Sequence, residues 1–442
     1  MQKETILNIG FDDTDSLKGM CTTYLAYNLV DSLKKENVQF LDYPRLIRFN
    51  PNIPWKTRGN GAVALKIKTN KPDMVKNRVI EFVKKFSDTK NGANPGVVFC
   101  ENTLLTEEFT KFSKRALWQL ISRKHAKKFV SDHNLESFYI GNGQGLIGAI
   151  GAIGYNFSDY TYELLSYRKK SKFGKKRILV TDNVRQMQEK TYPRTFNSYD
   201  TKNHKVLFAP HSPDPVFFGI RGEDAKSLLT ASKLIKTLEK PVGHMIFKSN
   251  QGTGDHLQNE IDVLSLKPYC SGIIIGVISI APKMDKGGHV MFAIKKDGIE
   301  IKCAVYKETG ITKNAMGLIV GDKLCVGGGI RKASSKYERV LNLEFFKVLR
   351  LERQQILVNP MCIQCKKHMK SKGHDQGFEC IKCGRKSDKK VIKQIPRQIK
   401  KQIYVPQVSA HRHLTRPQQR LGVTNKESQF NNSIPWFHNY NN

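Results

Sequence analysis

Three carboxylates lie within four residues near the start of the chain, in the run FDDTDS. Asp12, Asp13 and Asp15 would repel one another in a short loop unless a cation lies among them, and hydrated Mg²⁺ bound by carboxylates and phosphates is the usual cation. The same residue types also cap helices, because Asp and Thr side chains accept hydrogen bonds from free backbone N–H groups. The loop is therefore a candidate magnesium and phosphate site, with helix capping as the alternative.

The KTRGNG run, residues 56–61, is a second candidate for phosphate chemistry. It combines two cationic side chains with two glycines, so that backbone N–H groups and side-chain charges could together bind phosphate oxygens. Such a loop is also often solvated surface, or a contact to a nucleic-acid backbone. A Walker A pattern, GxxxxGK[ST], is absent from the sequence, which excludes a P-loop.

A glycine-dense segment carries Gly141, Gly143 and Gly145 in a GxGxG arrangement. This pattern alone is weak support for a nucleotide site, because the acidic partner about 20 residues further on is not securely placed in a βαβ unit. Glu163 lies in that range, but within an aromatic run typical of a strand. Close packing of the glycine backbone against a neighbouring element is the alternative.

Four of the nine cysteines form two pairs with the spacing C-x2-C-x14-C-x2-C, namely Cys362, Cys365, Cys380 and Cys383. Paired thiolates at loop tips close a tetrahedral zinc site, and four protein ligands leave no position open for a reactive water. The sequence therefore predicts a structural zinc ribbon rather than a catalytic metal. The odd number of cysteines and their paired spacing favour metal binding over disulfides, in a reducing compartment.

The overall charge indicates a polyanionic partner. The 442 residues include 74 Lys and Arg against 39 Asp and Glu, for a formal net charge of +35 and a pI near 9.8, so nucleic acid is the leading candidate. The hydrophobic fraction of 39% excludes a chain that is disordered throughout. No apolar run reaches the roughly 18 residues that a membrane helix needs, so we expect a soluble cytoplasmic protein without a membrane partner.

The first part of the chain alternates strand and helix patterns that would position these loops. The apolar run ILNIGF precedes the acidic loop, and apolar residues recur at helical spacing over 22–33, so the loop should lie at the entrance to a helix. Further strand patterns cover 39–49 and 62–68, on either side of KTRGNG, and helical patterns cover 72–86 and 117–129. This order predicts an α+β fold.

The second part of the chain has a different pattern. Residues 271–351 hold five strand-like runs, including an Asp297-Gly298 hairpin signal, and a short helical pattern near 312–318 lies between the third and fourth runs. Five strands in this order predict an OB-fold barrel. The tail, residues 391–442, is basic with little apolar periodicity, so we expect it to be disordered. Barrel, ribbon and basic tail together fit RNA binding.

Three motifs taken together point to a known family: IGFDDTDSLKGMCTTYLA over 9–26, PRLIRFNPNIPWKTRGNGAVAL over 44–65, and GNGQGLIGAIGAIGY over 141–155. They resemble the archaeal TiaS family of tRNA(Ile) 2-agmatinylcytidine synthetases. The similarity continues in order through the shorter motifs PVFFGIRGE and FKSNQGT and covers most of residues 1–390. The tail beyond residue 390 lies outside this resemblance.

The resemblance implies a reaction and its partners. The enzyme would be an ATP-dependent ligase that attaches agmatine to C2 of the wobble cytidine in a CAU-anticodon tRNA(Ile), so that the tRNA decodes AUA. In that family a kinase-like domain phosphorylates the C2 carbonyl oxygen of cytosine and the amine of agmatine displaces the phosphate, while ATP is converted to AMP and two phosphates. Nothing in the sequence identifies a protein partner.

The resemblance also implies a domain order. We expect a multidomain α+β protein with a kinase-like catalytic domain over residues 1–135, completed by residues 200–268, although the local pattern does not decide to which unit the latter segment belongs. A ferredoxin-like domain would cover 136–199, an OB-fold 269–352 and a zinc ribbon 353–390.

Matching positions inherit expected roles. The residues expected to be catalytic are Asp12, Asp13, Asp15 and Thr22. Thr22 is expected to become phosphorylated, and Asp12 and Asp13 are expected to bind magnesium. The KTRGNG element is expected to steady the triphosphate of ATP through Lys56, Arg58, Gly59 and Asn60.

Agmatine carries a primary amine and a guanidinium, so its pocket needs acidic or carbonyl acceptors, and the amine must lose a proton before it attacks. We take Glu163 and the carbonyls of Gly143 and Gly145 as candidates. The target cytidine must be turned out of its stack, which is easier in a single-stranded anticodon loop, while the OB-fold and ribbon would bind the tRNA.

Two other functions fit the same residues. A nonenzymatic single-stranded nucleic-acid-binding protein built on the OB-fold and ribbon would bind in a salt-dependent and nucleotide-independent manner. An RNA or protein kinase with the same metal loop would transfer phosphate without any amine. Nucleotide-independent function that survives mutation of the acidic loop would favour the binding protein, and dependence of the product on agmatine separates the kinase from the ligase.

Overall fold

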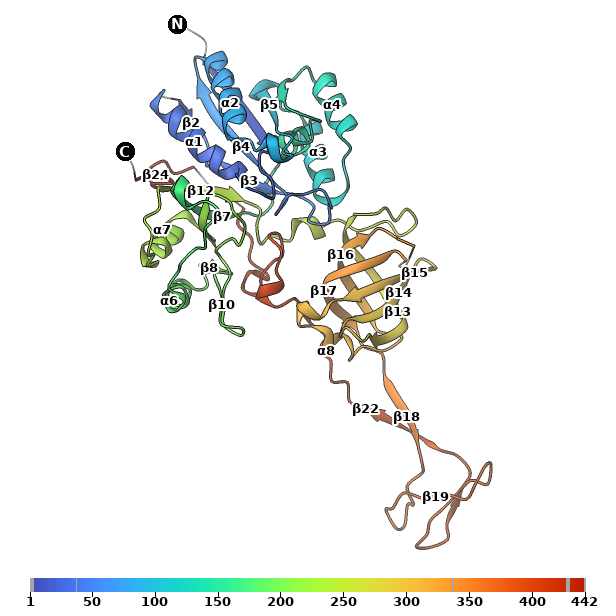
Figure 1. Cartoon of the computed structure of the whole chain (residues 1–442). Helices are drawn as coiled ribbons and strands as arrows, with labels where there is room; N and C mark the ends of the chain where they lie inside the picture. The colour runs from blue at the N-terminus through green and yellow to red at the C-terminus, as the bar shows by residue number, and fades with distance from the viewer. Residues whose placement is uncertain (1–3, 37, 336–337, 427–429, 441–442) are drawn as a thin grey trace. The chain divides into compact units, whose positions relative to one another are not determined.

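The computed structural model describes residues 4–36, 38–335, 338–426 and 430–440 (Figure 1). The chain divides into two units. The first comprises Met1–Ile273, Gly327–Arg339 and Val405–Asn442, and the second comprises Ile274–Val326 and Val340–Tyr404. The described helices include none that is long and apolar enough to cross a membrane.

The first unit is built around one mixed sheet. Its strands are β1 (Thr5–Asp12), β2 (Gln39–Phe40), β3 (Arg45–Arg48), β4 (Gly61–Thr69), β5 (Gly96–Glu101), β6 (Glu136–Tyr139), β7 (Thr161–Tyr167), β8 (Thr195–Phe196), β11 (Val216–Gly222), β12 (Gly243–Ser249) and β24 (Phe437–Asn439). Within the described residues the order is β6-β5-β1-β4-β3-β12-β7-β11-β8, while β2 pairs with β4 and β24 with β12. A separate pair is formed by β9 (Tyr199–Asp200) and β10 (Lys205–Val206).

Helices cover both faces of this sheet (Figure 1). They are α1 (Thr22–Lys35), α2 (Pro72–Phe86), α3 (Glu107–Trp118), α4 (Arg123–Asp132), α5 (Gly145–Ile153), α6 (Thr181–Thr191) and α7 (Ala225–Leu234). Strand β5 shows how the faces divide, because side chains alternate along a strand. Val97 and Phe99 pack with residues of α1 and α2, whereas Val98 and Cys100 pack with residues of α3, α4 and α5.

Helix α5 is the central buried helix of the first unit. Its sequence, GLIGAIGAI, is apolar all round, and a helix of that kind is stable only inside a core. Its glycines permit a close approach to the sheet, because a Cβ at Gly148 would overlap the Asp12 carboxylate and one at Gly151 would lie 2.7 Å from the Phe49 ring. The helix therefore fixes the end of β1, where the acidic loop begins.

Two predicted elements are divided in the structure. The helical pattern over 117–129 becomes α3 and α4, because Ser122 ends the run by capping α4: its hydroxyl accepts a hydrogen bond from the backbone N–H of His125 (3.2 Å). The strand pattern over 39–49 becomes β2 and β3 with Pro44 between them, since proline donates no hydrogen bond to a sheet. The other predicted elements of the first 90 residues are confirmed.

The N-terminal strands and the later strands belong to one sheet. Strand β12 pairs in parallel with β3, with Lys248 opposite Arg45, and also pairs antiparallel with β7. The segment 200–268, which carries β11 and β12, thus contacts strands on both sides of the predicted boundary at residue 135. The predicted domain limits themselves stay predictions.

A closed barrel of five strands follows, as the sequence predicted. Its strands are β13 (Ser271–Met284), β14 (Val290–Lys296), β15 (Ile299–Val305), β16 (Lys323–Arg331) and β17 (Val340–Arg350), and pairing of β15 with β17 closes it. The helix α8 (Thr312–Ala315) lies between β15 and β16. Asp297 and Gly298 have φ of 49° and 81° in the turn from β14 to β15, which confirms the predicted hairpin.

The cysteine module extends from the barrel on a two-stranded ribbon. Strand β18 (Gln354–Val358) pairs with β22 (Val391–Ile395), and between them lie the short strands β19 (Lys370–Ser371), β20 (Phe378–Glu379) and β21 (Lys386–Ser387). The small hydrophobic cluster in this module consists of Cys362, Met369, Phe378 and Cys380.

The expectation that residues 391–442 are disordered is wrong for the described part of the tail. Strands β22, β23 (Ile403–Tyr404) and β24 lie in it, and the side chains of Leu414, Arg420 and Trp436 are buried. The tail shows no apolar period because its apolar residues are buried one at a time against elements formed elsewhere in the chain. Residues 427–429 and 441–442 lie outside the described residues.

Candidate active site

A cavity of about 920 Å³ in the first unit gathers residues that the sequence places far apart. Its wall includes the end of β1, the start of α1, the KTRGNG loop and the strands β7 and β11. Among the predicted site residues it is lined by Asp12, Asp13, Asp15, Thr22, Lys56, Arg58, Gly59, Asn60 and Glu163.

The acidic loop turns sharply at the end of β1. Asp13 has a left-handed backbone with φ of 57°, a conformation that short polar residues tolerate. Its carboxylate accepts a hydrogen bond from the backbone N–H of Asn94 (3.3 Å), and the Asp15 carboxylate pairs with Arg58 (2.9 Å). The N-cap of α1 is Cys21, so helix capping does not explain these carboxylates.

Burial and mutual repulsion make this loop favourable for a cation. Burial, with Asp13 beside it, raises the pKa of Asp12 well above its usual value. Burial and the neighbouring Asp15 raise the pKa of Asp13 to about 6, and burial also raises the pKa of Asp15 although Arg58 opposes it. A positive ion would relieve the cost of ionising all three.

The donor set fits magnesium rather than a softer metal, because it offers only hard carboxylate oxygens. These carboxylates alone do not form a complete cage for an ion. Among the described residues, the one group of three or more His, Cys, Asp or Glu side chains close enough to share an ion is the cysteine group. Magnesium characteristically takes one or two carboxylates and completes its shell with water and substrate phosphates.

Thr22 is the first residue of α1. Its hydroxyl oxygen accepts a hydrogen bond from the Thr14 hydroxyl (3.0 Å), and the residue is buried in the protein while lining the cavity. The Cys21 side chain makes no capping hydrogen bond, and the first turn of α1 contains no acidic residue. The positive end of the helix dipole therefore faces the cavity, which suits a phosphate.

The KTRGNG loop is tied to the acidic loop by Arg58. Besides the ion pair with Asp15, its guanidinium donates to the carbonyls of Met20 (3.0 Å), Ser16 (2.8 Å) and Gly19 (3.3 Å). These bonds fix the path of the loop between Asp15 and Thr22. Lys56 donates to the Ile53 carbonyl (3.1 Å), and burial lowers its pKa.

Asn60 and Gly59 shape the same loop. Asn60 has a left-handed backbone with φ of 43°, and its side-chain amide donates to the Asn50 carbonyl (2.8 Å). A Cβ at Gly59 would lie 2.6 Å from Nε2 of His413 and 2.7 Å from Nη1 of Arg48, so only glycine leaves room for both side chains.

Glu163 is a buried carboxylate of the cavity. It lies 3.7 Å from Arg48 and 3.1 Å from Arg221 and accepts a hydrogen bond from the Gln251 side chain. Burial lowers the pKa of Arg48 although Glu163 opposes the shift. Two guanidinium groups around one carboxylate leave this region with excess positive charge, next to the negative acidic loop.

The structure does not bring Gly143 and Gly145 into the cavity wall, where their neighbours Asn142 and Gln144 lie instead. A Cβ at Gly145 would overlap the backbone of Gly96 and the Asp12 carbonyl, so this glycine serves close packing of α5 on the sheet. Gly143 has φ of 79° in the turn before the helix.

Several residues in or beside the cavity were not picked out from the sequence. Arg48, Arg221 and Gln251 lie in the motifs PRLIRF, GIRGE and SNQGT, so a search for charged or amide side chains within those motifs would have found them. Asp214 lines the cavity too. His413 gave no signal, because it lies in the basic tail.

The four predicted zinc ligands meet in the second unit. The sulfur atoms of Cys362, Cys365, Cys380 and Cys383 all lie within 4.8 Å of one another, which suits a tetrahedral zinc ion. Backbone hydrogen bonds lower the pKa of Cys362 and Cys380, whereas the neighbouring cysteine side chains raise the pKa of Cys365. The thiolate is the form that binds metal.

Family models match most of the chain. A model described as the TiaS TCKD domain matches residues 8–142, the TiaS FLD domain matches residues 143–256, and the TiaS C-terminal zinc ribbon domain matches residues 359–399.

Whole-chain relatives are similar over nearly their full lengths. A protein of Cenarchaeum symbiosum named as the 2-agmatinylcytidine synthetase TiaS, acting on an isoleucine tRNA, is 49% identical over 98% of this chain and 96% of its own. A protein of the same name from Thermococcus sibiricus is 40% identical over 93% of this chain and 95% of its own.

Solved structures give the same likeness. A complex of TiaS with its isoleucine tRNA and ATP superposes with a TM-score of 0.86 at 32% identity. A complex of TiaS with the same tRNA, AMPCPP and agmatine superposes with a TM-score of 0.83 at 30% identity. Each comparison covers 97% of this chain and 100% of the other.

Proposed function

The chain belongs to the TiaS family of 2-agmatinylcytidine synthetases that act on an isoleucine tRNA, and we propose that the cavity between β1, α1 and β7 is where it joins agmatine to the tRNA. It is an ATP-dependent tRNA-modifying enzyme with this isoleucine tRNA and agmatine as its partners and a structural zinc ribbon. One observation carries the placement: the acidic loop, the start of α1, the KTRGNG loop and the buried Glu163 all line one cavity.

The finer domain description is part of this proposal. We assign a kinase-like fold to the N-terminal domain and a ferredoxin-like fold to the domain that follows it, as the family resemblance implies. The nonenzymatic binding protein is not favoured, because whole-chain relatives are named synthetases and a related structure holds an ATP analogue with agmatine. A cytoplasmic location stays a prediction, which free thiols and a tRNA substrate support.

The start of α1 is suited to the phosphates of ATP. Thr22 would receive a phosphoryl group at the positive end of the helix dipole, and Lys56 would contribute a cation. Asp12 and Asp13 would bind Mg²⁺, which supplies positive charge to the phosphates when bound. Arg58 is already engaged with Asp15 and three carbonyls, so its role is to hold the acidic loop in place while Gly59 and Asn60 shape the wall.

The conjugation step needs an acceptor for agmatine and for a proton. Once the C2 carbonyl oxygen of the wobble cytidine carries a phosphoryl group from ATP, the primary amine forms a bond to C2, the C2–O bond breaks, and the oxygen departs with the phosphate. The ammonium form of agmatine must first lose a proton, because only the neutral amine carries the lone pair that attacks C2. Glu163 would face the guanidinium, although Arg48 and Arg221 already flank it.

The test is product formation by purified protein with CAU-anticodon tRNA(Ile), ATP and Mg²⁺, with and without agmatine, read by nucleoside mass spectrometry. We expect cytidine with the mass of conjugated agmatine only in the complete mixture. Asp12→Asn should lower its formation by at least about 100-fold while tRNA affinity stays nearly unchanged. Asp73→Asn, whose side chain is 90% exposed on α2, is the matched control.

The rival functions give different results in the same assay. A binding protein would retain the tRNA without altering any nucleoside and without response to ATP. A kinase would transfer phosphate to RNA or protein equally well when agmatine is left out. Either result would contradict the proposed function.

A further inference from the structure

The C-terminal segment 411–425 is built into the wall of the cavity. Its backbone joins the loop after β12, because the N–H groups of Gly252 and Gly254 donate to the carbonyls of His413 (2.9 Å) and Leu414 (2.8 Å). The Leu414 side chain is 1% exposed and packs in a core cluster with residues of β3 and α3. The segment is therefore an internal part of the first unit, not a mobile appendage.

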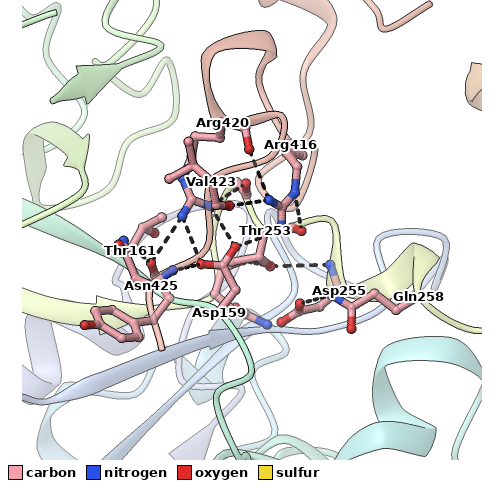
Figure 2. A network of polar contacts seen from close by, with 12 residues as sticks. Asp159, Thr161, Thr253, Asp255, Gln258, Arg416, Arg420, Val423 and Asn425 are labelled. Carbon is pink, nitrogen blue, oxygen red and sulfur yellow. Dashed lines mark hydrogen bonds and ion pairs between the residues drawn. The ribbon is translucent and has the colours of Figure 1, made fainter. Parts of the chain in front are cut away.

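A buried arginine anchors this segment (Figure 2). Arg420 is fully buried, and all five of its guanidinium N–H groups have partners. These partners are the carboxylates of Asp159 (3.0 and 3.1 Å) and Glu223 (2.7 Å) and the carbonyls of Gly252 (2.9 Å) and Tyr160 (3.4 Å). Figure 2 also shows Arg416 and Asn425 converging on Asp159. The Arg416 guanidinium donates to the Asp159 carboxylate (2.8 Å), and so does the backbone N–H of Asn425 (2.9 Å).

This ion-pair cluster fixes the path of the segment. A guanidinium buried with two carboxylates is favourable only in the geometry that satisfies its donors and both acids. The strands β7 and β11 lie beside these acids, since Asp159 precedes β7 and Glu223 follows β11. The same two strands carry Glu163 and Arg221 of the cavity, so the anchor and the cavity share one support.

Seven residues before Arg420, the His413 side chain reaches the cavity. Its Nδ1 lies 2.7 Å from Nη2 of Arg221 and 3.0 Å from Oε1 of Gln251. Because a guanidinium only donates, Nδ1 must accept from Arg221, and the ring proton therefore lies on Nε2 rather than between Nδ1 and the Gln251 oxygen. Burial, reinforced by Arg48 and Arg221, lowers the pKa of His413 well below its usual value, which agrees with a neutral ring.

His413 completes a chain of contacts that ends at the buried carboxylate. Arg221 donates through Nε to Glu163 (3.1 Å) and through Nη2 to the ring, so the imidazole restrains the far end of the Arg221 guanidinium. The other edge of the ring lies against Gly59, where a Cβ would come within 2.6 Å of Nε2. The ring thus connects the KTRGNG loop to the Arg221–Glu163 pair.

We propose that His413 is a positioning residue for the conjugation reaction. Its ring accepts a hydrogen bond from Arg221 and so holds Arg221 and Glu163 in place, while buried Arg420 fixes the tail. The inference rests on the proposed function. It assigns to the C-terminal segment, which lies beyond all three matching family models, a direct part in the catalytic cavity.

Two substitutions separate this role from simple packing. His413→Leu removes the acceptor and keeps most of the side-chain volume, whereas His413→Asn keeps an acceptor near the place of Nδ1. We expect His413→Leu to lower kcat for 2-agmatinylcytidine formation by at least about tenfold with an unchanged melting temperature, and His413→Asn to recover to within about threefold of wild type. Gln418→Ala, an exposed residue of the same segment, is the matched control and should behave as wild type.

An NMR measurement tests the arrangement without any turnover. In protein labelled with ¹⁵N-histidine, the signal lost in His413→Asn should be that of a neutral ring protonated on Nε2. A ring protonated on Nδ1, or on both nitrogens, would overturn the inference, as would full activity of His413→Leu or equal losses in both variants. If wild type makes no modified cytidine, the proposed function fails, and the NMR signal still decides the position of His413.

Discussion

The substitution Gly148→Ala tests whether the reaction requires the acidic loop to lie where α5 positions it. This glycine lies in the middle of α5, and a Cβ there would overlap the Asp12 carboxylate. In Gly148→Ala the carboxylate must move by at least about 1 Å, since van der Waals contact forbids the overlap. The backbone φ at Gly148 is not in the left-handed region, so alanine brings no backbone strain.

The expected loss of stability is small and the expected loss of activity is large. Alanine is favoured over glycine inside a helix by about 1 kcal/mol, while overpacking a core costs about 1–3 kcal/mol, so the net destabilisation is about 0–2 kcal/mol. A catalytic group displaced by about 1 Å lowers the rate by about 100-fold, or about 2.7 kcal/mol in activation free energy.

The assay compares Gly148→Ala with Gly151→Ala in the same helix. In the second variant the added Cβ meets the Phe49 ring at 2.7 Å instead of a carboxylate. Both variants should unfold at similar urea concentrations, but kcat for 2-agmatinylcytidine formation should fall by about 100-fold only in Gly148→Ala. If Gly148→Ala keeps wild-type kcat, or if both variants lose activity in step with stability, then α5 does not position Asp12 for the reaction.

Three further predictions concern other parts of the chain. Trp55 lines the cavity and is 64% exposed, so it can stack on a displaced base; Trp55→Ala should raise KM for tRNA by about tenfold, and an unchanged KM would contradict this. Cys380→Ser should abolish zinc binding and hydrogen-exchange protection in the ribbon while β13–β17 keep theirs; retained protection would refute a structural zinc. Burial lowers the pKa of His244 to about 4, and its ring contacts the Tyr440 hydroxyl (2.8 Å). The folded pKa of His244 is below its unfolded value, so the neutral ring contributes fully to the free energy of unfolding above about pH 6.5. That contribution is lost as pH falls toward 4, by up to about 3 kcal/mol. His244→Asn should flatten that dependence in urea unfolding between pH 7 and 5, and parallel curves for both proteins would show that another group is responsible.

The sequence by itself determined the features that depend on short-range order. The acidic loop before a helix, the hairpin at Asp297, the five strands of the barrel and the cysteine spacing all follow from local pattern, because turn residues, periodicity and ligand spacing act over a few residues. Long motifs also carried the family resemblance, which whole-chain relatives confirm.

Only the tertiary structure decided which of these residues meet. Arg58 braces the acidic loop, and Gly145 packs against β1 and β5, through contacts that join segments about 40 or more residues apart. The tail is the clearest case. No local sequence pattern indicates that His413 and Arg420 are buried and paired, since their partners Arg221 and Asp159 lie some 190 and 260 residues earlier in the chain. In a sequence, a single charged residue that will be buried looks the same as one on the solvated surface. Only the fold shows that buried acidic side chains lie beside it and pair with it.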